Sequence, residues 1–379
     1  MGPSIRAGWT ATVLAAVGLL AAMASPGEVR GDGAWETSEF PHHVIVADFN
    51  GDGFSDLAIC NAGDAKLSVL LGDGHGGFSS NRTYPTGRGP SWVDAADFDG
   101  DGHLDLVTAD TGDKGLTIYR GDGAGAFALM VKVTGYRSIG SAVAADFDRD
   151  GRPDLALLQP VERRIVILRN NGGGRFSQRA TYPLGTAPHI LGRVDLNGDG
   201  LPDLVVNVLT EGTVLVLLGR GDGTFAPPLV VNTGTTPHYR AYGDWNGDGR
   251  TDFAVSLAAL GSVRVVLARA DGGYELGQTI RVGINPHGLV NADFNGDGHQ
   301  DLAVANRTSK DLVVLLGDGT GHFKALAPEP IGEDVITLAT GDFDRDGRPD
   351  LVLLSAGGNR VLIWQSLGDG TFRPMPHKR

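Results

Sequence analysis

The chain has 379 residues, 58 of them glycine, and a formal net charge of −13. So much glycine excludes a mainly helical protein, because glycine destabilises helices, and an acidic chain without a basic stripe is not expected to bind nucleic acid. The single cysteine, Cys60, excludes an internal disulfide framework.

The first 24 residues have the order of parts of a secretory signal peptide. Arg6 precedes an apolar run of 16 residues, and the stretch closes on Ala22-Met23-Ala24, a small-residue cleavage pattern. The run is short for a membrane span, and an uncleaved N-terminal anchor is the alternative. We expect residues 1–24 to be removed and residues 25–379 to be a secreted or periplasmic monomer, with no membrane span after cleavage.

From residue 48 onward the chain repeats a nine-residue acidic stretch. It reads DFNGDGFSD at Asp48, and later copies start 49 residues apart, at residues 97, 146, 195, 244, 293 and 342. A second landmark, LLGDGHGGF ending at Phe78, keeps the same period. A fixed period of this size indicates one supersecondary unit per copy. The chain after the signal peptide is therefore expected to be one array.

Each repeat contains four predicted strands. In the first copy these are residues 43–49, 56–60 and 66–71 and a fourth segment that begins at Phe78, all β-rich and bounded by Gly, Asp, Asn or Pro. Four short antiparallel strands repeated seven times predict an all-β fold, a seven-bladed β-propeller with one acidic loop per blade. A linear β-solenoid is the alternative, but an open stack needs distinctive capping repeats, and here the end copies resemble the middle ones.

Closure of the ring needs a contribution from the chain ends. Trp35 lies 49 residues before Tyr84, a residue of the fourth predicted strand, and only seven residues follow Phe372. Both ends are candidates for the outer strand of the seventh blade. We expect the N-terminal segment to contribute there.

The acidic stretch has the composition of a calcium loop. Positions 1, 3, 5 and 9, counted from its first aspartate, carry Asp or Asn in every copy, and position 6 is always Gly. Ca²⁺ takes six to eight oxygen ligands in a flexible geometry, whereas Mg²⁺ prefers fewer protein ligands in an ideal octahedron. The loop begins like an EF-hand but lacks its glutamate at position 12, which is Ile59 in the first copy.

The ligand prediction is the same for all copies, with side chains at positions 1, 3, 5 and 9 and a backbone carbonyl at the variable position 7. A solvated acidic turn without metal is the alternative. About seven Ca²⁺ ions of structural type are expected, one per loop. The predicted metal-binding residues are Asp48, Asn50, Asp52, Phe54, Asp56, Asp97, Asp99, Asp101, His103, Asp105, Asp146, Asp148, Asp150, Arg152, Asp154, Asp195, Asn197, Asp199, Leu201, Asp203, Asp244, Asn246, Asp248, Arg250, Asp252, Asp293, Asn295, Asp297, His299, Asp301, Asp342, Asp344, Asp346, Arg348 and Asp350.

The repeated residues resemble a known family. The segment DFNGDGHQDLAVANRTSKDLVVLLGDGTGHF, residues 293–323, is similar to the FG-GAP or VCBS-type repeats of integrin α-chain propellers and of many secreted bacterial proteins. The resemblance covers about residues 29–379 and implies a seven-bladed propeller with Ca²⁺ in the blade hairpins. The functions of that family include adhesion, sugar binding and association with carbohydrate-active enzymes, so the fold does not settle the function.

A candidate ligand site comes from comparing the copies. The innermost strand of each blade should present its sixth, fourth and second residues before the first Asp on one face, toward the central channel. Most copies have small or apolar residues there, whereas blades 4 to 6 carry polar ones, and a hydrated lining without a ligand is the alternative. The predicted ligand-binding residues are His189, Arg193, His238, Arg240, Tyr242, His287 and Asn291.

Two functions fit these features. The first is a binding or adhesion module for a carbohydrate or protein, and the second is a polysaccharide lyase or hydrolase that uses the patch for acid–base chemistry. No nucleophile triad, P-loop or zinc-protease motif is present, which favours the binding module. Arg-Gly-Asp occurs at Arg30, Arg120 and Arg220, and the last two copies are interpreted as turn chemistry.

Overall fold

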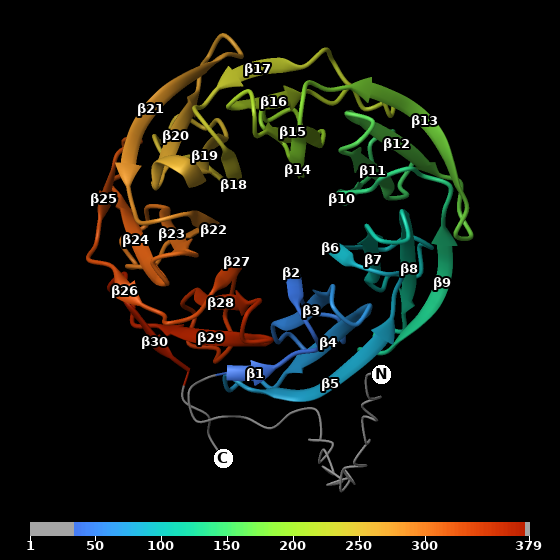
Figure 1. Ribbon diagram of the computed structural model, residues 1–379, viewed down its shortest axis with the longest axis horizontal. Coiled ribbons are helices and arrows are strands. Elements are labelled where there is room, and N and C mark those ends of the chain that lie inside the picture. The colour runs from blue at the N-terminus through green and yellow to red at the C-terminus, as the bar shows by residue number, and fades with distance from the viewer. Residues whose placement is uncertain (1–33, 376–379) are drawn as a thin grey trace, which may run out of the picture.

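The computed structural model describes residues 34–375, which form seven antiparallel sheets arranged around a common axis (Figure 1). The predicted signal peptide lies outside the described residues. The only helix of the described part is a single 3₁₀ turn, η1 (Ala258–Leu260). The prediction of an all-β, seven-bladed propeller with four strands per blade is confirmed.

The strands of each blade run in sequence order from the axis to the rim. Blade 1 has β2 (Pro41–Ala47), β3 (Asp56–Asn61), β4 (Lys66–Gly72) and β5 (Phe78–Pro85). Blade 2 has β6 (Pro90–Ala96), β7 (Asp105–Asp110), β8 (Gly115–Gly121) and β9 (Phe127–Val133). Blade 3 has β10 (Ser141–Ala145), β11 (Asp154–Gln159), β12 (Arg164–Asn170) and β13 (Phe176–Pro183). Blade 4 has β14 (Pro188–Val194), β15 (Asp203–Val208), β16 (Thr213–Leu217) and β17 (Leu229–Asn232).

The remaining three blades follow the same plan. Blade 5 has β18 (Pro237–Gly243), β19 (Asp252–Leu257), β20 (Ser262–Ala268) and β21 (Tyr274–Arg281). Blade 6 has β22 (Pro286–Ala292), β23 (Asp301–Asn306), β24 (Asp311–Gly317) and an outer edge divided between β25 (Phe323–Ala325) and β26 (Glu329–Pro330). Blade 7 has β27 (Val335–Gly341), β28 (Asp350–Ser355) and β29 (Arg360–Ser366), with β1 (Ala34–Glu36) and β30 (Phe372–Pro374) at its rim.

The second strand of every blade is buried along its whole length. In β3, for example, all six residues from Asp56 to Asn61 are buried, because both faces of a blade pack against neighbouring blades. This explains why these strands read as continuous apolar runs and not as alternating ones. The outer strands, such as β5, are half exposed.

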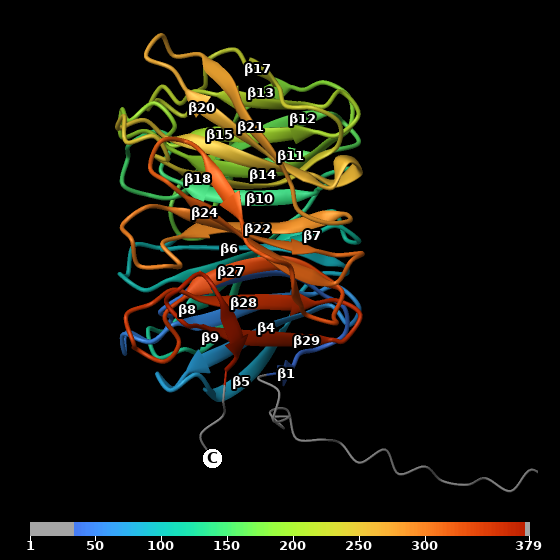
Figure 2. The same ribbon diagram turned by 90° about the vertical axis from the view of Figure 1, so that its left-hand side faces the viewer.

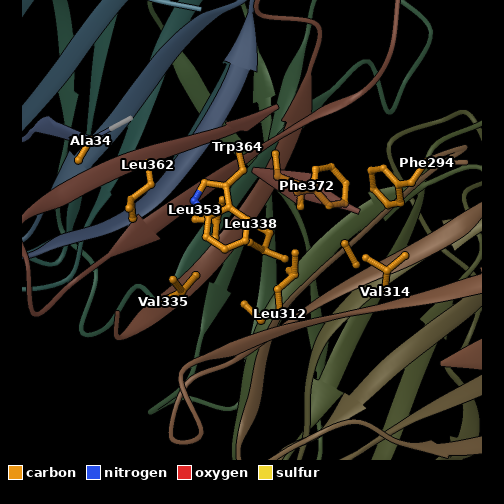
Figure 3. Packing of buried hydrophobic residues seen from close by; sticks show 13 residues of the cluster. Ala34, Phe294, Leu312, Val314, Val335, Leu338, Leu353, Leu362, Trp364 and Phe372 are labelled. Carbon is orange, nitrogen blue, oxygen red and sulfur yellow. The ribbon is translucent and has the colours of Figure 1, made fainter. Parts of the chain in front are cut away.

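The apolar core is divided among the spaces between adjacent blades. Figure 3 shows one such cluster, in which Phe294 and Val314 of blade 6 pack with Leu353, Trp364 and other residues of blade 7. Each blade therefore covers the apolar face of the next, and no blade could bury its core alone.

Both ends of the described chain close the ring. Strand β1 pairs antiparallel with β29, with Trp35 opposite Val361, and β30 pairs with the other half of the same strand, with Phe372 opposite Ser366. The predicted contribution of the N-terminal segment is confirmed, and the C-terminal segment shares the task.

The connections gather on two opposite faces of the ring, as the side view shows (Figure 2). The acidic stretch joins the first and second strands of each blade, so all the acidic loops lie on one face. The first residues of the innermost strands lie toward the opposite face. The two candidate sites are therefore at opposite ends of the axis.

Candidate functional site

The acidic loops are tight turns organised by their own carboxylates. In the first loop Oδ2 of Asp48 accepts the N–H of Gly53 at 2.8 Å, and the corresponding bond is present in the other six loops. Gly53 has a φ of 82°, and its equivalents have similar values. This region favours glycine over residues with a Cβ, which explains the invariant glycine at position 6.

The aspartate at position 9 ties each loop to the third strand. Asp56 is fully buried; its Oδ1 accepts the N–H of Gly72 at 2.7 Å and its Oδ2 accepts the N–H of Phe49 at 2.8 Å. Oδ1 of this aspartate accepts the equivalent bond from the third strand in every blade. Position 9 thus has a structural role, the attachment of the loop to the third strand, which the pattern of oxygen side chains in the sequence did not reveal.

Burial raises the pKa of the position-9 aspartates, and neighbouring carboxylates add to the shift. The pKa rises to about 6 for Asp56, Asp105, Asp154 and Asp252 and to about 7 for Asp350. A cation beside these groups would favour their ionised form. The electrostatics of the loops therefore suit an ion of high charge.

Three loops bring carboxylate oxygens together in the manner of a metal site. One oxygen from each of three aspartates lies within 4.8 Å of the others in blades 2, 3 and 7. Three buried oxygens in these loops, Asp148 Oδ1, Asp154 Oδ2 and Asp342 Oδ1, accept no hydrogen bond. A set of oxygen donors of this kind fits Ca²⁺. The converging aspartates are Asp97, Asp99 and Asp101; Asp146, Asp148 and Asp154; and Asp342, Asp344 and Asp350.

The two tasks of the loop can be separated in blade 4. We expect Asp203→Ala to destabilise the ring by about 2–4 kcal/mol with or without calcium, because it leaves the N–H groups of Gly219 and Leu196 buried without an acceptor. Asp199→Ala, at the exposed position 5, should lower stability more with calcium than without it, because without the ion it removes only hydrogen bonds of the exposed loop. Thermal melting of both variants in calcium and in EGTA measures the difference. Equal behaviour of the two variants would contradict the structural task of position 9.

The predicted ligand patch is divided by the structure into separate groups. Side chains of the innermost strand alternate between the two neighbouring blades, not between the axis and the core. In β2, Val44 and Val46 pack toward blade 7, whereas Ile45 and Ala47 pack toward blade 2. The expectation of one channel-facing set of alternate residues is therefore wrong, because blades pack face to face and present only a strand edge to the axis.

The histidines do not follow this alternation, because the strand pairing is irregular at the start of the innermost strands that carry them. The pairing register shifts between Pro41 and His43 in β2, and similar shifts pass over His189, His238 and His287. A residue left out of the pairing can point away from both sheet faces. Blades 1, 4, 5 and 6 thereby supply what we call the axial histidine cluster: His42, His189, His238 and His287.

The rings of the axial histidine cluster are close together. The ring centroids of His189 and His238 are 4.5 Å apart, and those of His238 and His287 are 4.0 Å apart. Tyr239 packs against His287 at 5.2 Å. The Nδ1 atom of His287 lies 2.7 Å from the carbonyl oxygen of Ile336 in the next blade, and His42 makes the equivalent contact with Ser91 at 2.9 Å.

The surroundings of the cluster favour its neutral form. Burial, followed by repulsion from the other histidines, lowers the pKa of His238 to about 2 and that of His189 to about 4. Burial also lowers the pKa of His42 and His287. The Nδ1 atoms of His189 and His238 are buried and have no hydrogen-bond partner.

Arg240 and Tyr242 form a second group, between blades 4 and 5. The Nε atom of Arg240 donates to the Tyr242 hydroxyl at 2.7 Å, and its Nη1 donates to the side-chain oxygen of Asn207. The amide nitrogen of Asn207 in turn donates to the carbonyl oxygen of His238. Arg240 thus holds the backbone of a cluster histidine through Asn207, which sequence reasoning did not identify.

Arg193 and Asn291 lie apart from both groups. Arg193 forms an ion pair with Asp94 of blade 2 at 3.2 Å and donates to the carbonyl of Ala144 in blade 3 at 2.7 Å. Asn291 donates to the side chain of Gln300 at 2.8 Å. Asp94 was missed by sequence reasoning, although it is the only acidic residue at its repeat position.

Two of the Arg-Gly-Asp sequences lie at the turns between third and fourth strands, as the sequence predicts; the copy at Arg120 begins in β8, and its aspartate enters the turn. Asp122 accepts the N–H groups of Ala124 and Ala126, and Asp222 accepts that of Thr224. These carboxylates stabilise their own turns. The copy at Arg30 lies outside the described residues.

Comparison with solved structures shows the same fold at low sequence identity. The chain is similar to BBS1N, solved in complex with ARL6DN, with a TM-score of 0.63 and 14% identity over 92% of this chain and 94% of that one. It is also similar to a periplasmic gluconolactonase, PpgL, of Pseudomonas aeruginosa, with a TM-score of 0.56 and 16% identity over 75% and 84%. These likenesses concern the fold alone.

Family models give the more specific result. A search of curated proteins found no match. Among the described residues, no helix is long and apolar enough to cross a membrane. The model of the FG-GAP-like repeat matches residues 48–108, 97–157, 195–255 and 293–353. These segments contain all seven acidic loops and cover more than half of the chain. The chain therefore belongs to the FG-GAP-like repeat family.

Proposed function

We propose that this protein is a secreted, calcium-stabilised binding module that holds a carbohydrate at the axial histidine cluster. Export rests on the signal peptide predicted at residues 1–24. The calcium loops have a structural task, because they are built alike in every blade and lie on the face opposite to the cluster. A protein ligand is the second candidate, and a glycan screen separates the two.

The observation that carries the proposal is the pair of unpartnered nitrogens on His189 and His238. A neutral imidazole offers one hydrogen-bond donor and one acceptor, which matches a sugar hydroxyl, itself both donor and acceptor. Buried polar atoms of native proteins normally have partners. The two imidazole rings are themselves partly exposed, so a polyhydroxylated ligand would bring hydroxyl groups to them, and the flat rings of Tyr239 and His287 offer it an apolar surface.

The calcium loops would support this site from a distance. The aspartate and asparagine oxygens at positions 1, 3, 5 and 9 and the carbonyl of position 7 would hold the ion, and position 9, which converges on the other aspartates in blades 3 and 7, would also join the loop to the third strand. Bound calcium supplies positive charge that offsets the repulsion among three or four carboxylates in one turn. The loops thereby stabilise the blades on which the histidines are carried.

Catalysis by the cluster is disfavoured by its protonation state. A general acid–base group works best when its pKa lies near the working pH. The pKa values of His238 and His189, about 2 and about 4, are far below neutrality. Binding is therefore the better interpretation of these imidazoles than the lyase or hydrolase chemistry considered from the sequence.

Ligand binding tests the site directly. We expect a glycan array to identify a carbohydrate ligand, and His238→Ala to weaken its binding at least about tenfold, or about 1.4 kcal/mol. The matched control is Ser91→Ala, at the equivalent position of blade 2, which should bind like the wild type. A product assay on the array hits examines the enzymatic alternative. Wild-type affinity of a correctly folded His238→Ala variant would overturn the proposed site.

A further inference from the structure

The residue type at loop position 3 correlates with the residue type at one position of the third strand in the same blade. We call this third-strand position the partner position. It directly precedes the residue whose backbone N–H donates to the position-9 aspartate. Loops with Asp at position 3 have Arg or Gln at the partner position, and loops with Asn have Leu, without exception. The polar pairs are Asp99 with Arg120, Asp148 with Arg169 and Asp344 with Gln365, and the others are Asn50 with Leu71, Asn197 with Leu218, Asn246 with Leu267 and Asn295 with Leu316.

In blades 2, 3 and 7, which we call the carboxylate class, the partner side chain contacts the additional aspartate. The Nε atom of Arg169 lies 2.8 Å from Asp148 Oδ2, and its Nη2 lies 3.0 Å from Asp150 Oδ2. Gln365 donates to Asp344 Oδ2 at 2.5 Å. In blade 2, Arg120 lies 3.4 Å from Asp99 and 3.6 Å from Asp101.

We call the loops of blades 1, 4, 5 and 6 the amide class. In these loops the asparagine at position 3 itself hydrogen-bonds a neighbouring aspartate of the loop. Its side-chain nitrogen donates to Oδ2 of the aspartate at position 5, at 2.8–3.0 Å in all four loops. The leucine at the partner position brings no charge or hydrogen bond. An arginine at position 7 occurs in both classes, in Arg152, Arg250 and Arg348, so it does not distinguish them.

The additional aspartate lies beside the other carboxylates of its loop. In each loop of the carboxylate class, its oxygen and one oxygen from each of two further aspartates lie within 4.8 Å of one another. In blade 3 the side chain of Asp148 is only 10% exposed; its Oδ2 is engaged by Arg169, whereas its Oδ1 has no hydrogen-bond partner. In blade 3, one oxygen of the additional aspartate is thus held by the partner side chain and the other is left for a cation, whereas in blades 2 and 7 that other oxygen accepts the backbone N–H of position 5 at 3.2 Å.

We propose that the ring contains two classes of calcium loop that respond differently to calcium removal. The proposal rests on the calcium binding proposed above. In the carboxylate class the partner side chain offsets the repulsion among the aspartates and holds the loop in shape when no ion is bound, as a group behind a metal ligand does. In the amide class the partner position carries no such side chain, and only blade 5 has an arginine in its loop, where Arg250 pairs with Asp248 at 2.7 Å, so these loops depend more on the ion.

The amide class coincides with the blades of the axial histidine cluster. His42, His189, His238 and His287 belong to blades 1, 4, 5 and 6, and no blade of the carboxylate class has a histidine at that position. Calcium removal would therefore loosen the part of the ring that carries the proposed ligand site and leave blades 2, 3 and 7 ordered.

Hydrogen exchange of the whole protein, measured by mass spectrometry with and without EGTA, resolves the blades. At free calcium about 100 times the dissociation constant, amides ordered by the ion should exchange about 100-fold more slowly than without it. We expect this change in peptides that contain the loops of blades 1, 4, 5 and 6. In EGTA, peptides with the loops of blades 2, 3 and 7 should stay at least about several-fold more protected than those of the amide class, because the partner side chain holds these loops without the ion.

Substitutions in blade 3 test the partner side chain itself. Arg169→Leu should give the blade 3 loop the calcium response of the amide class, and Arg169→Gln, which installs the residue found at this position in blade 7, should retain the wild-type pattern. The matched control is Arg179→Leu, an exposed arginine of the same blade whose Nη2 donates to the carbonyl of Asp222 in blade 4 at 3.1 Å. If Arg169→Leu does not fold, the wild-type exchange pattern and Arg169→Gln still decide.

The outcomes separate this inference from the proposed function. If seven loops bind calcium and all respond alike, the two classes are overturned while calcium binding stands. If Arg169→Leu folds and leaves the blade 3 response unchanged, the role of the partner side chain is overturned. If elemental analysis finds no bound calcium, both proposals fail together.

Discussion

Removal of calcium should lower the melting temperature of this protein by more than about 10 °C. Each loop that binds an ion only in the folded state stabilises that state by about 2.7 kcal/mol when free calcium is about 100 times the dissociation constant. With one loop in each of seven blades, the combined effect is large compared with the stability of an ordinary domain. Thermal melting in calcium and in excess EGTA measures it.

The number of bound ions provides the control. Elemental analysis after dialysis in calcium buffer should give about seven Ca²⁺ per chain, since every loop has a complete set of oxygen side chains. Magnesium at the same concentration should protect less. Two or fewer bound ions, or a melting curve that EGTA leaves unchanged, would show that the loops fold as solvated turns.

Trp35→Ala, in the N-terminal closing strand, should destabilise the ring by about 3–5 kcal/mol, the range for large-to-small changes of a buried aromatic residue. Trp35 is 8% exposed and contacts the ring of Phe78 edge-on at 5.1 Å, in the space between blades 7 and 1. Trp35→Ala removes this packing while the pairing of β1 with β29 can persist. Chemical denaturation of the variant measures the change in the free energy of unfolding.

The matched control for closure is a nearby aromatic residue on the surface. Phe40 is 51% exposed, so Phe40→Ala should change the stability by less than about 0.5 kcal/mol. Removal of the mature chain up to residue 36 should have a larger effect than Trp35→Ala. It also removes β1, the strand that pairs with residues 360–362 of β29. Equal stability of the shortened and intact chains would mean that β30 alone closes the ring.

The ligand patch shows the limit of aligning repeats. The comparison of copies identified His238 and Arg240 as unusual, and both are close to the axis or to the neighbouring blade. It placed them on one face, however, because strict alternation was assumed along the strand. The register shift after Pro237 and the packing of blade on blade separate them, so that His238 meets other histidines and Arg240 meets Asn207.

The sequence by itself determined the repeat, the strands and the acidic loops, because each of these depends on residues close together in the chain. A hairpin with an invariant glycine, such as Gly53, and a buried second strand, such as β3, are specified within one 49-residue copy. Seven equal copies then leave a closed ring as the arrangement in which every blade covers the next. The N-terminal contribution to closure could be predicted for the same reason, since Trp35 keeps the register of the repeat.

Only the tertiary structure decided which side chains meet across the blades and across the axis. Asp56 contacts Gly72 from 16 residues away, Arg169 lies 19 residues from Asp150, and His42 approaches Ser91 of the next blade. These contacts depend on register shifts, on the twist of each sheet and on the spacing of blades around the axis. None of these quantities is set by a short stretch of sequence, because each is the result of packing seven sheets against one another.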